Sequence, residues 1–310
     1  MNSKLSLFKK SQKEFCAQEF FNIAKQDLIA AKILYRNQLY PEALFFFQQS
    51  IEKAYKSYHL LSETGSNLTE NSTTSLTIFK IGHTPTKILE RQASDMESRL
   101  KEIKRIIDTV PNHQEIYENL GVDYTELIQQ FSELRRVSSQ ISANCNSQRQ
   151  MRLHELNDLI VDLSIMMKQS NRLSREIKKI SFDNATREQM KRKYLETFSP
   201  IFKHFPEHAA KFTKEIDLLF GNDFEKIEPI FKTYIQHRSD AGCINVIYSQ
   251  LSIITQSHES RTRYPGIDHS PIREYSRNHP VIQRFNTLVR YAEIANKKFD
   301  QIISSSGDLQ

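Results

Sequence analysis

Residues suited to binding phosphates and bases gather between positions 259 and 279, in the stretch ESRTRYPGIDHSPIREYSRNH. Pro265, Gly266 and Pro271 indicate that this stretch is a loop. A guanidinium group binds phosphate oxygens, and an aromatic face stacks on an unpaired base. The candidate binding residues in this loop are Arg261, Arg263, Tyr264, His269 and Arg277, with Tyr275 between the last two. A solvated, charged loop without a ligand is the alternative interpretation.

The overall composition favours an all-α protein. The chain has 310 residues, of which only 7 are Gly and 9 are Pro. A β-rich fold needs more of both for its tight turns, whereas long helices need neither. Hydrophobic residues make up 38% and charged residues 26%, which is compatible with a packed core. The length allows one large domain or two ordinary ones.

Charge and cysteine content bear on the partners and the cellular compartment of the protein, but they do not indicate its function. The net charge of +6 permits contact with phosphate-rich partners without requiring it. The three cysteines, Cys16, Cys145 and Cys243, are too far apart for metal-ligand or redox spacing. A polar N-terminus and the lack of a long apolar run predict a cytoplasmic protein without signal peptide or membrane contact. No Gly-rich phosphate loop, zinc pattern or nucleophile elbow occurs, so no cofactor and no metal are expected.

Two amphipathic helices are predicted near the N-terminus. Residues 15–36 carry apolar side chains at spacings of three and four, and Asn37 is a plausible stop because Asn tolerates the left-handed conformation. A second helix is predicted from Pro41 to about Leu61, with a wide apolar stripe. The short connection predicts that the two helices are antiparallel neighbours. A closing helix is predicted from Pro280 to about Ser304, with one apolar face.

The long stretch between these helices also has helical periodicity. Weak breaks, among them one at Gly242, separate its segments. Residues 114–181 could form a hairpin with coiled-coil-like packing, but the irregular heptads favour the core of a helical subdomain. The predicted helices lie near 91–109, 114–142, 148–181, 185–204, 207–219, 223–237 and 241–257.

Charged and apolar positions follow one pattern across the first helical pair. The pattern is A-x-x-D-L-x-x-A in the first helix, then a Tyr-containing turn and A-x-F-x-x-Q-x-x-E-K-x-x-K in the second. Its positions here are Ala24, Asp27, Leu28, Ala31, Tyr40, Ala43, Phe45, Gln48 or Gln49, Glu52, Lys53 and Lys56. In this pattern the pair resembles the opening of a HEPN domain. Gly82, His83 and Leu89 are similar to a signature that opens the family's third helix, and Arg263-Tyr264-Pro265 resembles an R-Y-P motif before its last helix.

The resemblance implies one helical bundle that is interrupted by a helical insertion subdomain. Residues 15–90 would form the first part of the HEPN-like bundle and residues 259–304 its last part. Residues 91–258 would be the insertion, which is a departure because members of the family are usually compact. No family is recognised within that insertion.

HEPN proteins include metal-independent endoribonucleases and non-cleaving members. The ribonucleases carry an Arg, which binds a phosphate, followed after four to six residues by a His, which moves a proton to or from the RNA 2′-OH. Roughly two such pairs are expected here by chance, and three occur: Arg149–His154, Arg263–His269 and Arg273–His279. Arg273 and His279 precede the last helix, where the family motif lies, so they are the candidate catalytic residues. Glu274 is unfavourable beside them, because a carboxylate opposes phosphate binding.

The resemblance implies a HEPN protein that binds RNA or nucleotides in a defence or toxin–antitoxin system. It also implies a homodimer and a cognate nucleotidyltransferase or other protein partner, which the insertion would contact. His83, Lys53 and Lys56 join the candidate binding residues, although His83 could be a helix-entry residue and the lysines an ordinary charged face. Two alternatives stay open: an endoribonuclease that uses Arg273 and His279, and a non-catalytic protein-interaction scaffold.

Overall fold

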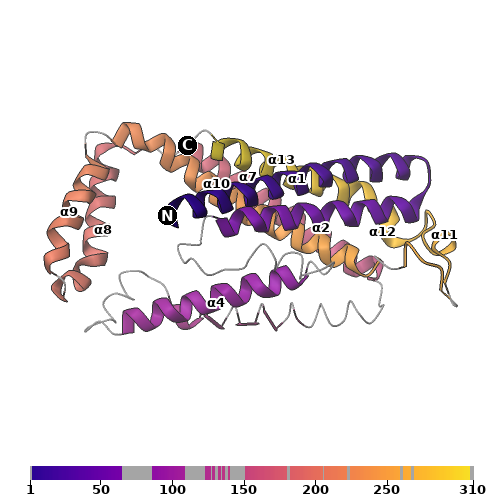
Figure 1. Ribbon diagram of the computed structural model, residues 1–310, viewed down its shortest axis with the longest axis horizontal. Helices are drawn as coiled ribbons and strands as arrows, with labels where there is room; N and C mark the ends of the chain where they lie inside the picture. The colour runs from indigo at the N-terminus through magenta and orange to yellow at the C-terminus, as the bar shows by residue number, and fades with distance from the viewer. Residues whose placement is uncertain are drawn as a thin grey trace. The chain divides into compact units, whose positions relative to one another are not determined.

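Every regular element that the structure describes is an α-helix, so the predicted all-α fold is confirmed. The computed structural model (Figure 1) describes residues 2–64, 86–108, 123–126, 128–129, 132–133, 135–136, 139, 151–179, 182–204, 206–221, 224–258, 261–266 and 269–307. In chain order the helices are α1 (Asn2–Arg36), α2 (Tyr40–Thr64), α4 (Thr86–Asp108), α7 (Leu153–Lys179), α8 (Asn184–His204), α9 (Pro206–Phe220), α10 (Phe224–Gln256), α11 (Pro271–Glu274), α12 (Pro280–Gln283) and α13 (Phe285–Gly307). None of these described helices is long and apolar enough to cross a membrane.

The chain folds into two compact units, which are described here one at a time. Unit 1 comprises Met1–Glu90, Val137–Ser170 and Asp240–Gln310. Unit 2 comprises Arg91–Arg136 and Asn171–Ser239.

The core of unit 1 joins the N-terminal helical pair to the closing helix. Phe21 of α1 packs edge-on against Phe299 of α13, with ring centroids 4.7 Å apart. Tyr35 of α1 stacks on Phe285 of α13 at 4.5 Å, and Phe47 of α2 meets the same ring at 5.4 Å. Complete burial of such a side chain contributes about 1.5–3 kcal/mol. The apolar stripes of α1, α2 and α13 therefore face one common core.

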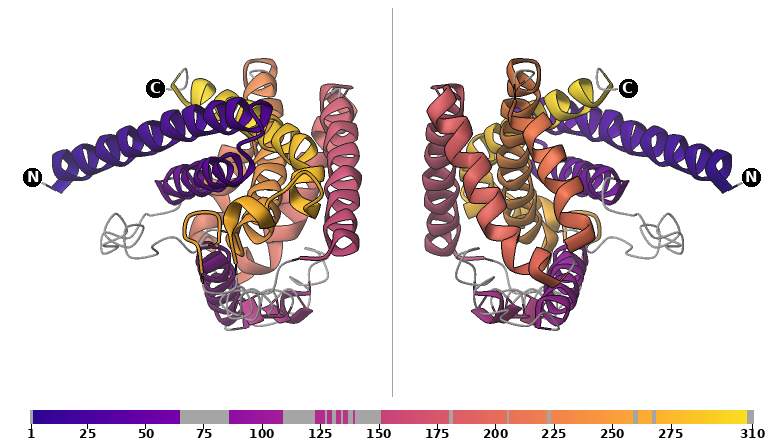
Figure 2. Two further views of the ribbon diagram at one scale, coloured as in Figure 1. Left: turned by 90° about the vertical axis from the view of Figure 1, so that its right-hand side faces the viewer. Right: turned by 90° about the vertical axis from the view of Figure 1, so that its left-hand side faces the viewer.

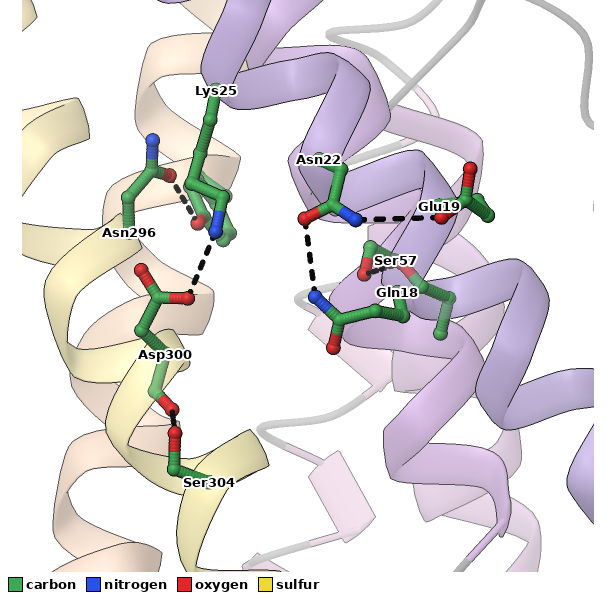
Figure 3. Close-up of polar contacts among 10 residues, drawn as sticks. Gln18, Glu19, Asn22, Lys25, Ser57, Asn296, Asp300 and Ser304 are labelled. Atoms are coloured by element: carbon green, nitrogen blue, oxygen red, sulfur yellow. Dashed lines mark hydrogen bonds and ion pairs between the residues drawn. The ribbon is translucent and has the colours of Figure 1, made fainter.

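Polar contacts between these helices contribute little to the stability of the bundle, but they help to fix how the helices align. Lys25 of α1 reaches Asp300 of α13 at 3.1 Å (Figure 3), but both side chains are more than a third exposed. Such an ion pair contributes about 0–1 kcal/mol. Ser57 of α2 donates a hydrogen bond to the carbonyl of Ala17 at 2.6 Å, which is possible because alanine lets the two helices approach closely. Burial of apolar surface is thus the larger contribution.

The turn between α1 and α2 differs from the prediction in one detail. The left-handed residue is Gln38, with φ of 63°, and not Asn37. The Asn37 side chain instead donates from Nδ2 to the carbonyl of Ile33 at 2.9 Å. The Ile33 carbonyl also accepts from the Asn37 amide at 3.1 Å, so the side chain adds a second hydrogen bond to the last turn of α1, and the following residue reverses the chain.

Three predicted helix boundaries also differ from the structure. The first helix is predicted to begin at residue 15, whereas α1 begins at Asn2. Residues 223–237 and 241–257 are not separate helices, because α10 continues through Gly242. The predicted closing helix is interrupted at Arg284, which separates α12 from α13. The Nε atom of Arg284 donates to Oδ1 of Asn157 on α7 at 2.8 Å, so the break lets this side chain bind another helix.

Unit 1 includes residues that the sequence analysis assigned to the insertion. Leu156 and Leu163 of α7 and Ile247 and Leu251 of α10 are buried in the same core as α1, α2 and α13. The compact units therefore differ from the predicted segments 15–90, 91–258 and 259–304, because these two helices complete the core. The extent of the HEPN-like bundle itself stays a prediction.

Unit 2 contains most of α4, together with α8 and α9, which pack against each other. Its own small apolar core consists of Phe182, Ile216, Phe220 and Phe224. The rings of Phe220 and Phe224 stack at 5.7 Å. Residues 114–181 were the possible hairpin, and most of their first part, 114–150, lies outside the described residues.

Candidate nucleic-acid interface

The predicted loop lies at the end of unit 1 where α1 passes into α2 (Figures 1 and 2). We call its described residues, 261–266 and 269–279, the arginine loop. Pro271 opens the short helix α11, which contacts α2, and Tyr275 directly after it is 1% exposed. The amide of Gly266 donates to the carbonyl of His269 at 3.0 Å, and only a glycine leaves space there for the His269 ring. Local turns and one buried ring therefore fix the loop on the bundle.

Arg261 does not face a ligand in this arrangement, because it binds Glu274. Nε of Arg261 donates to Oε1 of Glu274 at 3.0 Å, and Nη2 donates to Oε2 at 3.2 Å. The carboxylate raises the pKa of Arg261 above its ordinary value. Glu274, which the sequence analysis judged unfavourable for phosphate binding, is therefore compensated within the loop.

The other three arginines of the loop point to solvent. Arg263, Arg273 and Arg277 are exposed, and no carboxylate among the described residues forms an ion pair with any of them. Tyr264 is 60% exposed. We call Arg263, Tyr264, Arg273 and Arg277 the arginine–tyrosine surface.

Phe45 of α2 supports this surface and was not predicted as a site residue. The Arg263 guanidinium lies 4.8 Å from the centroid of the Phe45 ring and 5.3 Å from that of Tyr264. Such cation–π contacts hold a guanidinium flat against a ring while its N–H groups stay available. The sequence signal was indirect, since Phe45 was noted only as a position of the HEPN pattern.

His279, the predicted catalytic histidine, is buried with 8% of its surface exposed. Its Nδ1 accepts a hydrogen bond from the amide of Val281 at 3.3 Å and so caps α12. Burial is the main cause that lowers the pKa of His279. Because Nδ1 accepts, the neutral ring carries its proton on Nε2, where it can donate a proton but not accept one.

The predicted catalytic pair is therefore not assembled for RNA in this conformation. Arg273 is exposed on α11, whereas His279 is buried at the start of α12. A general base must reach the proton that it removes through a free lone pair. The catalytic assignment of Arg273 and His279 stays a prediction.

The predicted lysines of α2 are engaged in ion pairs. Lys53 binds Asp27 of α1 at 2.5 Å, and Lys56 binds Glu52 at 2.6 Å. The charged positions of the HEPN pattern thus pair with each other, and one pair joins α1 to α2. His83 lies outside the described residues, and His269 is half-buried.

A second feature beneath the loop was not predicted. His258, which follows α10, is 2% exposed, and its Nδ1 lies 2.8 Å from the hydroxyl of Tyr275. Its ring centroid is 5.5 Å from that of His279, and the ring of Tyr275 is 4.7 Å from His279. Burial lowers the pKa of His258 to about 3, and the nearby His279 and Arg261 add to this effect. No sequence periodicity marks a contact between these three irregular positions.

Metal binding finds no support in the described part of the chain. No group of three or more His, Cys, Asp or Glu residues there could hold a metal ion. The arrangement of the arginine loop is instead one of cations and aromatic rings.

Comparison with known proteins supports the resemblance found in the sequence. No curated protein and no solved structure matches the chain significantly. The family model of the HEPN domain matches residues 17–142, a stretch that includes α2 and the pair of Asp27 and Lys53. The match continues through residues 91–142 and ends before the arginine loop. This chain therefore contains a HEPN domain.

Proposed function

We propose that this protein binds single-stranded RNA through the arginine–tyrosine surface. The observation that carries the proposal is the pairing of Arg261 with Glu274, which compensates this carboxylate, while three other arginines of the described loop are exposed. Exposed guanidinium groups bind phosphates, and the exposed ring of Tyr264 offers a face to a base. Bases in a single strand are available for such stacking, whereas bases within a duplex are not. A free nucleotide also has a phosphate and a base, so it is the alternative ligand for this surface.

Fluorescence anisotropy of a short labelled RNA, recorded over a salt series, tests this proposal. We expect each of Arg263→Gln, Arg273→Gln and Arg277→Gln to weaken binding and to reduce the slope of log affinity against log salt by about 0.7, the value for one single-strand phosphate contact. Tyr264→Ala should cost about 1–3 kcal/mol of binding free energy, because one stacking face is lost. Arg290→Gln is the matched control, because Arg290 is exposed on α13 outside the loop.

Two results would contradict RNA binding at this surface. One is the absence of salt-sensitive binding by the wild-type protein. The other is an Arg290→Gln variant that loses as much affinity as the loop variants. Competition by mononucleotides would distinguish an RNA ligand from a nucleotide ligand.

The endoribonuclease alternative is less well supported by the geometry. His279 is buried and its Nδ1 is occupied, so cleavage would need a rearrangement of the start of α12. RNA incubated with the protein in EDTA tests the alternative directly. Cleavage that is lost in both Arg273→Ala and His279→Ala would support the enzyme, and binding without cleavage would support the proposal above.

The remaining parts of the proposal follow from the HEPN domain alone. HEPN domains often dimerise, and we infer a homodimer, which light scattering of the purified protein can measure. A nucleotidyltransferase or other protein partner and a cytoplasmic defence or toxin–antitoxin setting are further expectations from the resemblance. If neither RNA nor nucleotides bind, a protein-interaction scaffold becomes the better interpretation.

A further inference from the structure

Three buried aromatic side chains lie along the path of the arginine loop. His258 lies where the chain enters the loop, Tyr275 lies within it, and His279 lies where the chain leaves it. His258 precedes the loop, and its carbonyl accepts hydrogen bonds from the amide and the hydroxyl of Thr262 at 3.0 and 2.9 Å. Tyr275 follows α11, and His279 precedes α12. We call these three residues the ring cluster. A contact among them closes the base of the whole loop, because each belongs to a different part of its path.

The ring cluster is buried and its rings touch one another. His258, Tyr275 and His279 are 2%, 1% and 8% exposed. Each pair of rings has a centroid separation between 4.7 and 5.5 Å. The hydroxyl of Tyr275 and Nδ1 of His258 form a direct hydrogen bond between two of the rings, at 2.8 Å. This geometry is compatible with two neutral imidazoles.

Protonation of the cluster would meet several opposing effects. A charged imidazole loses hydration when it is buried, and a second charge at this separation would repel the first. Among the described residues, the charged groups that act on the two rings are Arg261 and Glu274, both in the loop itself. Glu274 favours a charge on His279, but Arg261, which Glu274 binds, disfavours a charge on either ring. The balance of these effects favours the neutral cluster.

We propose that His258, Tyr275 and His279 form a proton-sensitive clasp, which holds the arginine loop on the bundle when both imidazoles are neutral and releases the loop when one is protonated. The released loop would no longer hold Arg263, Tyr264, Arg273 and Arg277 in fixed positions on the bundle. Acidification would therefore weaken RNA binding, and this last consequence rests on the proposed function. The clasp itself concerns only the attachment of the loop, whatever the ligand is.

Hydrogen exchange of the full chain, measured by mass spectrometry at about pH 7.5 and about pH 5.0 and corrected for intrinsic rates, tests the clasp. In the open loop His258 regains its ordinary pKa of 6.5, whereas in the closed loop the pKa is about 3. The closed state is therefore favoured above pH 6.5 and loses its advantage as the pH falls below that value. From His258 alone, protection of the segment 271–285 should fall about 30-fold between the two pH values. Peptides from α1 and α2 should keep their protection.

His258→Gln is the main variant, because glutamine can still bind the Tyr275 hydroxyl but cannot titrate. We expect its loss of protection on acidification to be at least about tenfold smaller than that of the wild-type protein. His154→Gln is the matched control, since His154 is an exposed histidine of the same unit and should respond like the wild-type protein. Tyr275→Phe keeps the buried ring and removes only the hydroxyl. It should lower protection of segment 271–285 several-fold already at about pH 7.5.

Three outcomes would overturn the clasp. They are protection of segment 271–285 that does not change with pH, an unchanged response in His258→Gln, and an equal loss in α1 and α2, which would mean global unfolding. If His258→Gln does not fold, unchanged protection in Tyr275→Phe at about pH 7.5 overturns the clasp instead. A separate measurement, RNA affinity at the same two pH values and at constant ionic strength, tests the consequence for RNA binding. A pH-dependent loop without RNA binding would retain the clasp and contradict only the proposed function.

Discussion

Glu274 changes the electrostatics of the arginine loop by binding Arg261 instead of facing solvent. The two residues are thirteen positions apart in an irregular segment, so no helical or strand periodicity could have indicated their contact. From the sequence, the residue types and their segment could be named as a candidate site. The sequence could not indicate which of the four arginines would be neutralised, because that choice depends on how the loop folds around α11.

A double-mutant cycle on Arg261 and Glu274 tests this residue-scale explanation. Arg261→Gln leaves a largely buried carboxylate without its cation, so it should lower the free energy of unfolding by about 1–3 kcal/mol. It should also weaken RNA binding, because the uncompensated carboxylate then repels phosphates near Arg273. The double variant Arg261→Gln, Glu274→Gln should recover most of both losses. Urea denaturation and anisotropy measure the two effects, and losses that simply add in the double variant would contradict the pairing.

His279 shows a limit of motif spacing at the same scale. Its distance along the chain from Arg273 fits the ribonuclease pattern, yet the ring caps α12 and lies in a buried cluster. Spacing in sequence cannot distinguish a histidine that faces a substrate from one that ends a turn. Burial was the missing information, and it depends on His258, a residue that no motif marked.

At the scale of the helices, hydrophobic periodicity predicted α2 and the C-terminal end of α1 well, because their apolar positions recur on one face. It did not predict that α1 begins as early as Asn2. It was less reliable where a single residue was taken as a break. Gly242 was expected to separate two helices, but α10 continues through it. A glycine lowers helix propensity by only about 1 kcal/mol, which the buried neighbours of α10 in the core outweigh.

Gly242→Ala should therefore stabilise the protein. Residue 242 is exposed in a helix, and a Cβ atom there would meet nothing within 4 Å. The free energy of unfolding should rise by about 0.4–1 kcal/mol, because alanine loses less backbone entropy on folding. Gly266→Ala is the opposite control, since its Cβ would collide with the His269 ring. Thermal unfolding of the two variants should move in opposite directions, and destabilisation by Gly242→Ala would mean that α10 is not continuous there.

At the scale of the molecule, the HEPN match and the compact core cover different parts of the chain. The match extends over residues 17–142, whereas the core of unit 1 also uses α7, α10 and α13. Periodicity in sequence shows that a helix has an apolar face, but not which other face will cover it. For this reason the sequence indicated that α13 closes the bundle without indicating the contributions of α7 and α10.

This difference predicts that residues 1–142 do not fold alone. Without α10 and α13, Phe21 and Phe47 would lose the rings and aliphatic side chains that bury them, among them Phe285 and Phe299. Losing the burial of only a few such side chains, at about 1.5–3 kcal/mol each, exceeds the stability margin of a typical domain. The fragment should therefore bind a hydrophobic dye and lack a cooperative thermal transition, unlike the full chain. Mixing it with a fragment of residues 143–310 should restore the transition, because that fragment supplies the missing helices. A cooperative transition in fragment 1–142 by itself would show that the matched region is a complete domain and that α10 and α13 only cover it.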